Sequence, residues 1–339
     1  MSSRVRIESS GHEFVVEQDE TILAAALRQG LALPYSCRSG LCGACKGKVL
    51  SGSVDYGEYE EKALSAAERA AGKALFCQAV PRADLVIDAR EVTAVEGIPI
   101  KTLPCRVVRL EQLAHDVMAL HLKLPQAERL QFLAGQYIDI LLRAGQRRSF
   151  SLANSPHDDE LLEIHVRHVA GGHFSEHVFK SMKERELLRF QGPYGIFFLR
   201  KDSERPILFM AGGTGFAPVK SILEHAFAKG ETRPMHLFWG AQQEEDLYMH
   251  GLAATWAREH DNFRYTPVLS EAQPEDNWHG RSGWVHEILA DDYPDLSEYE
   301  VYASGPPPMI EAGKSEFAAH GLPEDQLYFD SFEFSHEKG

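Results

Sequence analysis

The chain shows three successive patterns of hydrophobic and polar positions, and the first covers residues 4–88. Short stretches in which hydrophobic and polar residues alternate predict strands that bury one face. They fall at residues 4–7, 13–17, 48–50, 75–80 and 85–88, with short helices expected at 19–27, capped by Asp19 or Thr21, and at 64–71. This mixture of a few strands with one or two helices predicts a small α+β domain.

The second pattern is a series of short strands at regular intervals. They are expected at residues 105–110, 117–124, 137–142, 148–153, 161–168 and 187–191, with one helix at 173–184. Turn residues such as Gly135, Gly145 and Asn154 separate them. Regularly spaced strands with intervening turns predict a small antiparallel barrel.

The third pattern begins at Arg205 with a continuous apolar strand at 206–211, a glycine turn at 212–215 and a helix at 217–229. Further strands are expected at 235–240, 263–269 and 300–303, with helices up to about residue 260 and at 285–289 and 309–320. Strand, turn and helix repeated in this order predict an open parallel α/β sheet. We therefore expect three domains, at residues 1–97, 98–203 and 204–339, with a linker at about 91–101.

Four cysteines form the most informative motif of the chain. Cys37, Cys42 and Cys45 follow the spacing C-x4-C-x2-C, and Cys77 lies further along. This is the ligand pattern of a plant-type 2Fe–2S cluster, whereas zinc sites more often use paired C-x2–4-C motifs and disulfides are the third alternative. Gly40 and Gly43 allow the backbone to fold closely over a cluster. Cys105 remains as a buried structural thiol.

Charge and composition exclude several classes of protein. The chain carries 35 Lys+Arg and 50 Asp+Glu, and this net charge of −15 argues against a nucleic-acid partner. Only the expected middle domain has more basic than acidic residues, which suits an anionic cofactor. No apolar run approaches the length of a membrane-spanning helix, and the N-terminus lacks the apolar core of a signal peptide. Five cysteines, four of them assigned to a metal, fit a reducing cytoplasm.

These motifs resemble known families. Residues 1–97 are similar to a plant-type ferredoxin domain with a β-grasp fold, and Arg148-Ser-Phe-Ser151 resembles the flavin signature of the ferredoxin–NADP reductase superfamily. The resemblance implies FAD, with Arg148 at its pyrophosphate, Phe150 over the isoalloxazine and Ser151 near N5. By the same resemblance a second flavin element contains His165, Arg167, Gly172 and Ser175.

The resemblance extends to the nicotinamide site. Gly212, Gly213, Thr214 and Gly215 are similar to the family's phosphate-binding turn between a strand and a helix. Ser304, Gly305 and Pro306 resemble the segment that flanks the nicotinamide, although the family usually has Cys where this chain has Ser304. The aromatic C-terminus either forms a packed strand or places Phe332 on the flavin, with Glu333 as a proton relay.

The cofactors imply a direction of electron flow. NADH gives two electrons as hydride, FAD accepts the pair, and a 2Fe–2S cluster carries one electron at a time to a protein acceptor that docks at the cluster loop. The chain resembles CDP-6-deoxy-hexulose-3-dehydrase reductases and, as the alternative, reductase components of bacterial multicomponent oxygenases. A stand-alone flavin reductase is a further alternative, and a redox sensor lacks an output domain here.

A preference for NADH over NADPH is also expected. The 2′-phosphate of NADPH needs a basic residue near the adenosine ribose, and residues 241–248 contain none. Gln242 stands where the family often has Arg, and Glu244, Glu245 and Asp246 would repel an extra phosphate. Arg281 in a later loop is the basic residue that could overturn this expectation.

Overall fold

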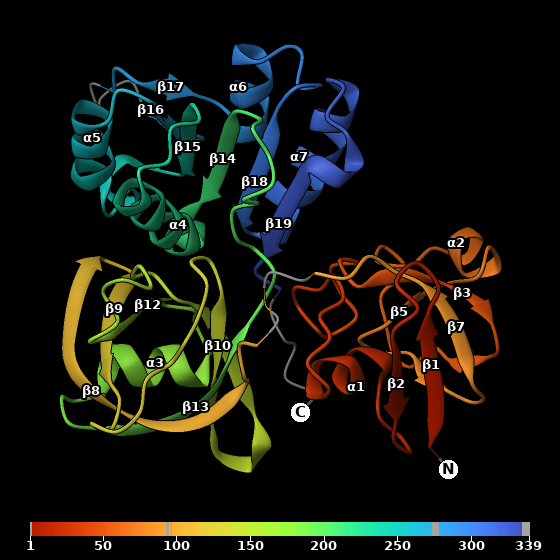
Figure 1. Ribbon diagram of the computed structural model, residues 1–339. Helices are drawn as coiled ribbons and strands as arrows, with labels where there is room; N and C mark the ends of the chain where they lie inside the picture. Colours follow the sequence, from red (N-terminus) through yellow and green to blue (C-terminus); the bar gives the residue numbers. More distant parts are fainter. Residues whose placement is uncertain (1, 93–94, 96, 273–277, 334–339) are drawn as a thin grey trace. The chain divides into compact units, whose positions relative to one another are not determined.

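The computed structural model describes residues 2–92, 95, 97–272 and 278–333 (Figure 1). The chain divides into two compact units, Met1–Pro99 with Glu333–Gly339, and Ile100–Phe332. The expected linker at 91–101 spans the boundary between them, and its residues 93, 94 and 96 lie outside the described part of the chain. Unit 2 contains both the predicted flavin domain and the predicted nucleotide domain.

Unit 1 is built on a five-stranded sheet with the order β2-β1-β7-β3-β5. Its elements are β1 (Ser3–Ile7), β2 (Glu13–Val16), α1 (Ile22–Arg28), β3 (Lys46–Ser51), β4 (Val54–Asp55), α2 (Ala66–Ala70), β5 (Lys73–Leu75), β6 (Val80–Pro81) and β7 (Leu85–Asp88). Strands β1 and β2 form the expected hairpin, and β1 also pairs in parallel with β7. Strands β4 and β6 form a separate two-stranded sheet.

Local sequence signals set the helix starts in unit 1. Of the two expected caps, Thr21 is the N-cap of α1, where its hydroxyl accepts a hydrogen bond from the Ala24 amide, whereas Asp19 adopts a positive φ of 61° before the helix. Ser65 and Glu68 form a reciprocal capping box at α2. One expectation was wrong: residues 75–80 do not form one strand, because β5 ends at Leu75, the chain turns through Cys77, and β6 begins at Val80.

The first half of unit 2 is the expected antiparallel barrel. Its strands follow the order β11-β10-β13-β8-β9-β12. A β-bridge between Leu152, just after β11, and Ile164 of β12 joins the first and last strands of this order. The elements are β8 (Lys101–Ala114), β9 (Val117–Lys123), β10 (Tyr137–Leu141), β11 (Arg147–Ser151), β12 (Leu162–Arg167), α3 (His173–Lys180) and β13 (Leu187–Tyr194). Helix α3 ends earlier than expected, because the Ser181 and Met182 amides both turn back to the His177 carbonyl.

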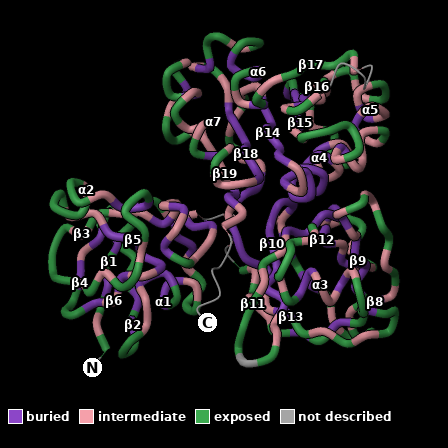
Figure 2. The backbone as a smooth tube through the Cα atoms, turned by 180° about the vertical axis from the view of Figure 1, so that it is seen from behind, coloured by how far each residue is buried: buried purple, intermediate pink, exposed green. Residues whose placement is uncertain are grey.

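The second half of unit 2 is a parallel sheet with the order β17-β16-β15-β14-β18-β19. Its elements are β14 (Ile207–Gly212), η3 (Gly213–Gly215), α4 (Phe216–Lys229), β15 (Met235–Ala241), η4 (Glu244–Asp246), α5 (His250–Glu259), β16 (Phe263–Leu269), β17 (Arg281–Ser282), α6 (Val285–Asp292), β18 (Glu300–Gly305), α7 (Pro307–Ala319) and β19 (Leu327–Ser331). The central strands are buried along their length (Figure 2).

Helices cover both faces of this parallel sheet. One hydrophobic cluster joins α4 and α5 to one face, and a second cluster joins α6 and α7 to the other. This arrangement brings the carboxyl ends of β14, β15 and β18 together at one edge, where ligands bind in open α/β sheets. In the part of the chain that the structure describes, every helix is too short or too polar to cross a bilayer.

Candidate functional site

The four predicted metal ligands lie together in unit 1. Cys42, Cys45 and Cys77 are buried and Cys37 is partly exposed. Their thiols interact as two close pairs, Cys37 with Cys42 and Cys45 with Cys77, and weaker electrostatic interactions join the pairs. The loop and the turn after β5 therefore bring all four sulfurs to one place.

The two pairs distinguish between the metals considered for this site. A single zinc ion would draw all four sulfurs into one tight tetrahedral group. Two separate pairs suit a cluster with two irons, each held by two thiolates, so the donor set fits 2Fe–2S.

The backbone of the cysteine loop depends on its glycines. Gly40 has a φ of +79°, and a Cβ atom there would meet the Glu58 carbonyl oxygen at 2.7 Å. Gly43 has a φ of +75° and lies against the Ala63 backbone. The segment at residues 58–63 thus packs directly on the loop, which only glycine permits at these positions.

The predicted flavin strand is β11, where alternate residues have different surroundings. The Phe150 ring packs on Phe174 of α3 at a centroid distance of 5.3 Å. Ser151 is buried, and its hydroxyl donates to the Asp330 carboxylate over 3.3 Å. Arg148 is half-buried on the same strand face as Phe150. The strand therefore presents a cation, a ring and a hydroxyl in sequence, as a flavin site requires.

In the second predicted flavin element, the Ser175 hydroxyl already has hydrogen-bond partners within the protein. The Ser175 hydroxyl donates within its own loop toward the carbonyls of Val169 and Gly172, and it accepts from the Val169 amide. Gly172 is the N-cap of α3. A phosphate here would consequently rely on the backbone N–H groups at the start of α3 rather than on this hydroxyl.

His165 and Arg167 of the same element both face the nucleotide half of unit 2. The His165 side chain is fully buried and both ring nitrogens have protein partners, so its ring offers no free atom to a flavin. The Arg167 guanidinium pairs with Asp116 over 2.6 Å and lies 3.2 Å from where a Cβ of Gly213 would stand. These two residues remain predictions as flavin ligands.

The predicted nucleotide turn follows β14, and glycine is required at several of its positions. A Cβ at Gly215 would stand 2.0 Å from the Ser304 carbonyl oxygen, and one at Gly212 would stand 2.6 Å from the Met309 sulfur. Gly305, with a φ of +148°, lies against the Gly212 backbone. The two predicted nucleotide segments, residues 212–215 and 304–306, are therefore in direct contact.

Ser304 supports the placement of a nicotinamide at this edge. Its hydroxyl oxygen is fully buried and has no hydrogen-bond partner among the described residues. Buried polar groups are normally satisfied, so an unpaired hydroxyl at the carboxyl end of β18 fits a site that a ligand completes. Phe332 lies beside it, because its amide donates to the Gly305 carbonyl.

Glu333, the predicted proton relay, has a lysine partner. Glu333 belongs to unit 1, where its carboxylate lies 3.7 Å from the Lys62 ammonium group and is almost fully buried. The carboxylate beside Ser151 is instead Asp330 on β19. The proton-relay role of Glu333 stays a prediction, and Asp330 is a further candidate site residue that sequence reasoning did not find.

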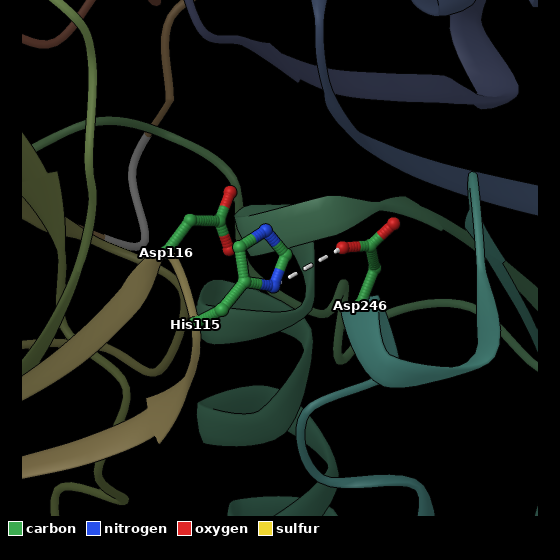
Figure 3. A group of neighbouring side chains, drawn as sticks. All are labelled: His115, Asp116 and Asp246. Carbon is green, nitrogen blue, oxygen red and sulfur yellow. Dashed lines mark ion pairs between the residues drawn. The ribbon is translucent and has the colours of Figure 1, made fainter.

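One cluster outside these segments has donor atoms suited to a metal. His115 and Asp116, between β8 and β9, and Asp246 of η4 bring three possible ligand atoms within 4.8 Å of one another (Figure 3). Arg167 already neutralises Asp116, and Asp246 accepts from the Gln243 amide. We assign the cluster to polar contact between the two halves of unit 2.

Replacing Arg148 tests the flavin strand directly. Arg148→Ala should weaken FAD retention by about 1.5–3 kcal/mol, because a phosphate would lose a charge-assisted hydrogen-bond partner. The FAD content of the purified protein measures the effect. Arg143→Ala, at an exposed position just before the strand, is the control. Unchanged FAD content in the Arg148 variant would remove it from the pyrophosphate site.

Comparison with protein families identifies three domains in the same order. Residues 5–82 match the 2Fe-2S iron-sulfur cluster binding domain. Residues 104–199 match the oxidoreductase FAD-binding domain, and residues 209–315 match the oxidoreductase NAD-binding domain. The three matches show domains that bind a 2Fe–2S cluster, FAD and NAD(P)H.

Similar proteins cover the whole chain. It is 40% identical to a CDP-6-deoxy-L-threo-D-glycero-4-hexulose-3-dehydrase reductase of Yersinia pestis, over 98% of this chain and 99% of the relative. It is 37% identical to the reductase component of a Pseudomonas phenol 2-monooxygenase, over 98% and 95%. The crystal structure of an Amycolatopsis cytochrome P450 reductase superposes with a TM-score of 0.81 at 36% identity, covering 97% of this chain and 98% of that one.

Proposed function

Because this chain belongs to the ferredoxin–NADP reductase-like proteins with an N-terminal 2Fe–2S ferredoxin domain, we propose that it supplies electrons to a CDP-6-deoxy-hexulose dehydrase. The chain is an iron–sulfur flavoprotein oxidoreductase that moves electrons from NADH through FAD to the cluster. Bound FAD converts a hydride pair into single electrons, which is the chemistry that this order of cofactors needs. A protein component accepts them, as the named relatives imply.

The similarity to the Yersinia reductase carries this choice of acceptor. Identity of 40% extends over nearly the full length of both chains, so it includes the ferredoxin domain, from which electrons leave. The phenol 2-monooxygenase reductase component is similar over the same length at 37%. The slightly higher identity favours the dehydrase as the acceptor. No single motif separates the dehydrase reductases from the oxygenase reductase components.

The second candidate acceptor is an oxygenase component. The TM-score of 0.81 with the Amycolatopsis cytochrome P450 reductase favours it, because that likeness covers all three domains. A carbazole 1,9a-dioxygenase ferredoxin reductase also superposes over 98% of this chain, at a lower TM-score of 0.73. Both candidates use the same internal electron path and differ only in the protein that docks.

Reconstitution decides between the acceptors. Purified holoprotein and NADH are mixed with a CDP-6-deoxy-hexulose 3-dehydrase or with a phenol 2-monooxygenase hydroxylase, and product formation is measured. We expect turnover with the dehydrase at least tenfold above that with the hydroxylase. The reverse ratio would move the chain to the oxygenase systems. Rapid reduction of free flavin, with no gain from either protein, would favour the stand-alone flavin reductase.

We further propose that the acceptor docks at the cysteine loop. Cys37 is the most exposed of the four ligands, and Ser39 beside it is exposed. Ser39→Trp, which adds bulk at this exposed position, should slow reduction of the protein acceptor several-fold. NADH-driven reduction of ferricyanide, a small acceptor, should stay unchanged. Equal rates for both acceptors in this variant would place docking elsewhere.

A reducing location such as the cytoplasm follows as a proposal from the ligand set. Four cysteines can hold a cluster only while they stay reduced, and cytosolic glutathione and thioredoxin maintain that state. Fractionation of cells that naturally produce the protein, followed by its detection in each fraction, tests this location. Recovery in a compartment that forms disulfides would contradict it.

The preference for NADH gains support from residues that the structure brings together. The Gln242 side chain, after β15, donates to the Glu271 carboxylate over 3.2 Å, and the Glu271 amide donates to the Gln242 carbonyl over 3.0 Å. Glu271 follows β16, so a carboxylate lies at the edge where the adenosine ribose is expected. Arg281, the basic residue that could reverse the preference, pairs with Asp292 over 2.6 Å.

We therefore expect a higher kcat/KM for NADH than for NADPH with an artificial acceptor. Gln242→Arg should raise kcat/KM for NADPH roughly tenfold or more, since a charge-assisted hydrogen bond to phosphate contributes about 1.5–3 kcal/mol. Gln126→Arg, at an exposed position of the barrel half, controls for added charge. A higher kcat/KM for NADPH than for NADH in the unaltered protein would refute the proposed preference for NADH.

A further inference from the structure

A continuous polar network joins the two halves of unit 2 beneath the candidate site. Glu163 and His165 come from β12 of the barrel half, and Lys220 comes from α4 of the nucleotide half. Tyr248, from the segment between η4 and α5, completes it. We call these four residues the interdomain clamp. The hydride-transfer step described above does not by itself require any of them.

Lys220 is the ionic centre of the interdomain clamp. Only 6% of this residue is exposed, yet its ammonium group meets three acceptors. They are the Glu163 carboxylate at 3.3 Å, the Glu224 carboxylate at 3.0 Å and the Ala153 carbonyl at 3.1 Å. Three donors thus meet three acceptors, which is the full capacity of an ammonium group. Displacement of this buried ammonium group would leave it and its acceptors unpaired. The three contacts therefore hold Lys220 in one position.

His165 connects the ionic centre to Tyr248. Its Nε2 lies 2.7 Å from Glu163 and its Nδ1 lies 2.9 Å from the Tyr248 hydroxyl. Burial lowers the pKa of His165, so the ring is neutral. Burial raises the pKa of Tyr248 well above its usual value, so its hydroxyl stays protonated. The protons are then fixed: Tyr248 donates to Nδ1, and Nε2–H donates to Glu163.

Glu163 remains charged inside this network. Burial alone would raise the pKa of its carboxyl group, but the hydrogen bond from His165 and the charge of Lys220 outweigh burial and lower it to about 2. The network therefore keeps one arrangement of charges near neutral pH. A single arrangement with all partners satisfied makes the contact between the two halves rigid.

Both ends of the clamp reach the segments assigned to the cofactors. Lys220 holds the carbonyl of Ala153, two residues after Ser151, and the neighbouring Ser221 hydroxyl donates to the Asn154 carbonyl over 2.7 Å. At the other end the Tyr248 ring packs edge-on against Trp239 at 5.1 Å. The Trp239 indole in turn donates to the Gly213 carbonyl over 3.1 Å, in the nucleotide turn.

We propose that Lys220 and Tyr248 are positioning residues for hydride transfer, which fix residues 151–154, at the end of the flavin strand β11, against the nucleotide turn at residues 212–215. The proposal rests on the assignment of these two segments to FAD and NADH. Neither residue touches the reacting atoms. Lys220 holds the Ala153 carbonyl of the barrel half directly. Tyr248 packs on Trp239, which in turn holds the Gly213 carbonyl of the nucleotide half. Hydride transfer depends steeply on the distance between donor and acceptor, and a displacement of about 1 Å can cost roughly a hundredfold in rate.

The test compares two clamp variants with two matched controls in the full-length holoprotein. Lys220→Met keeps the length of the side chain and removes its charge, and Tyr248→Phe removes only the hydroxyl. Lys229→Met alters an exposed lysine at the end of the same helix. Tyr265→Phe removes another partly buried hydroxyl, which pairs with His250 over 3.1 Å entirely within the nucleotide half.

We expect both clamp variants to slow flavin reduction at saturating NADH by about ten- to a hundredfold in anaerobic stopped-flow experiments. The KM for NADH and the FAD content should change little, and Lys220→Arg should recover part of the rate. Amide hydrogen exchange of the resting protein gives a second readout. Exchange should rise at residues 151–154 and 212–215 in the clamp variants and stay unchanged in both controls.

Two outcomes would overturn the proposal. In the first, the clamp variants match the controls in flavin-reduction rate and in hydrogen exchange at both segments. In the second, the rate falls only in proportion to lost FAD, which would make the network merely structural. Failure of the proposed acceptor is distinguishable, because flavin reduction by NADH and hydrogen exchange are both measured without any protein acceptor. If the two segments do not bind FAD and NADH, wild-type flavin is not reduced by NADH, whereas hydrogen exchange still reports on the clamp.

Discussion

Cys42→Ser should abolish one-electron output while NADH still reduces the flavin. The substitution removes one thiolate of the close pair that Cys42 forms with Cys37, so one iron loses a ligand. Visible absorbance of the 2Fe–2S cluster and reduction of cytochrome c should fall to background. The hydride step needs only the groups bound by unit 2, so flavin bleaching by NADH under anaerobic conditions should continue.

A second cysteine provides the control for this result. Cys105 is buried in the barrel half, where desolvation raises the pKa of its thiol to about 12, and it lies in a different unit from the four ligands. Cys105→Ser should keep the cluster spectrum and cytochrome c reduction intact. An unaltered cluster spectrum in Cys42→Ser would contradict the ligand assignment, whatever the rate with cytochrome c.

Ser151→Ala should slow flavin reduction by NADH roughly a hundredfold, within the range that loss of one preorganised polar group costs at a reaction centre, and Asp330→Asn should slow it less. The two side chains are each 7% exposed and are joined by a hydrogen bond of 3.3 Å. The Asp330 carboxylate orients the Ser151 hydroxyl, which the flavin signature places near N5. Asparagine keeps an acceptor but loses the charge, so Asp330→Asn should have the smaller effect.

The same strand offers a matched control. Ser149 donates to the buried carboxylate of Asp139 over 2.7 Å, a pair of the same chemistry within the barrel half. Ser149→Ala should leave the rate of flavin reduction within about twofold, because this pair is not assigned to either cofactor. Equal slowing by Ser149→Ala and Ser151→Ala would show that the effect arises from the strand and not from the site.

Local sequence determined which residues form the cofactor segments of this protein. The C-x4-C-x2-C spacing of the first three cysteines, the Arg148–Ser151 signature and the glycine turn after an apolar strand each depend on residues within about ten positions. Turn geometry and strand periodicity act over that range, so the patterns appear directly in the sequence. The cofactors that these segments imply also indicated the direction of electron flow, because hydride carries two electrons and a 2Fe–2S cluster carries one.

Only the tertiary structure decided which distant side chains complete those segments. Asp330 meets Ser151 across 179 positions of sequence, and Lys220 meets Glu163 across 57. The sequence did not suggest Asp330 as a partner of Ser151, nor the buried contact of His165 with Glu163. The roles predicted for Glu333 and His165 stay predictions. Such contacts depend on how separate elements pack, and no local pattern encodes them.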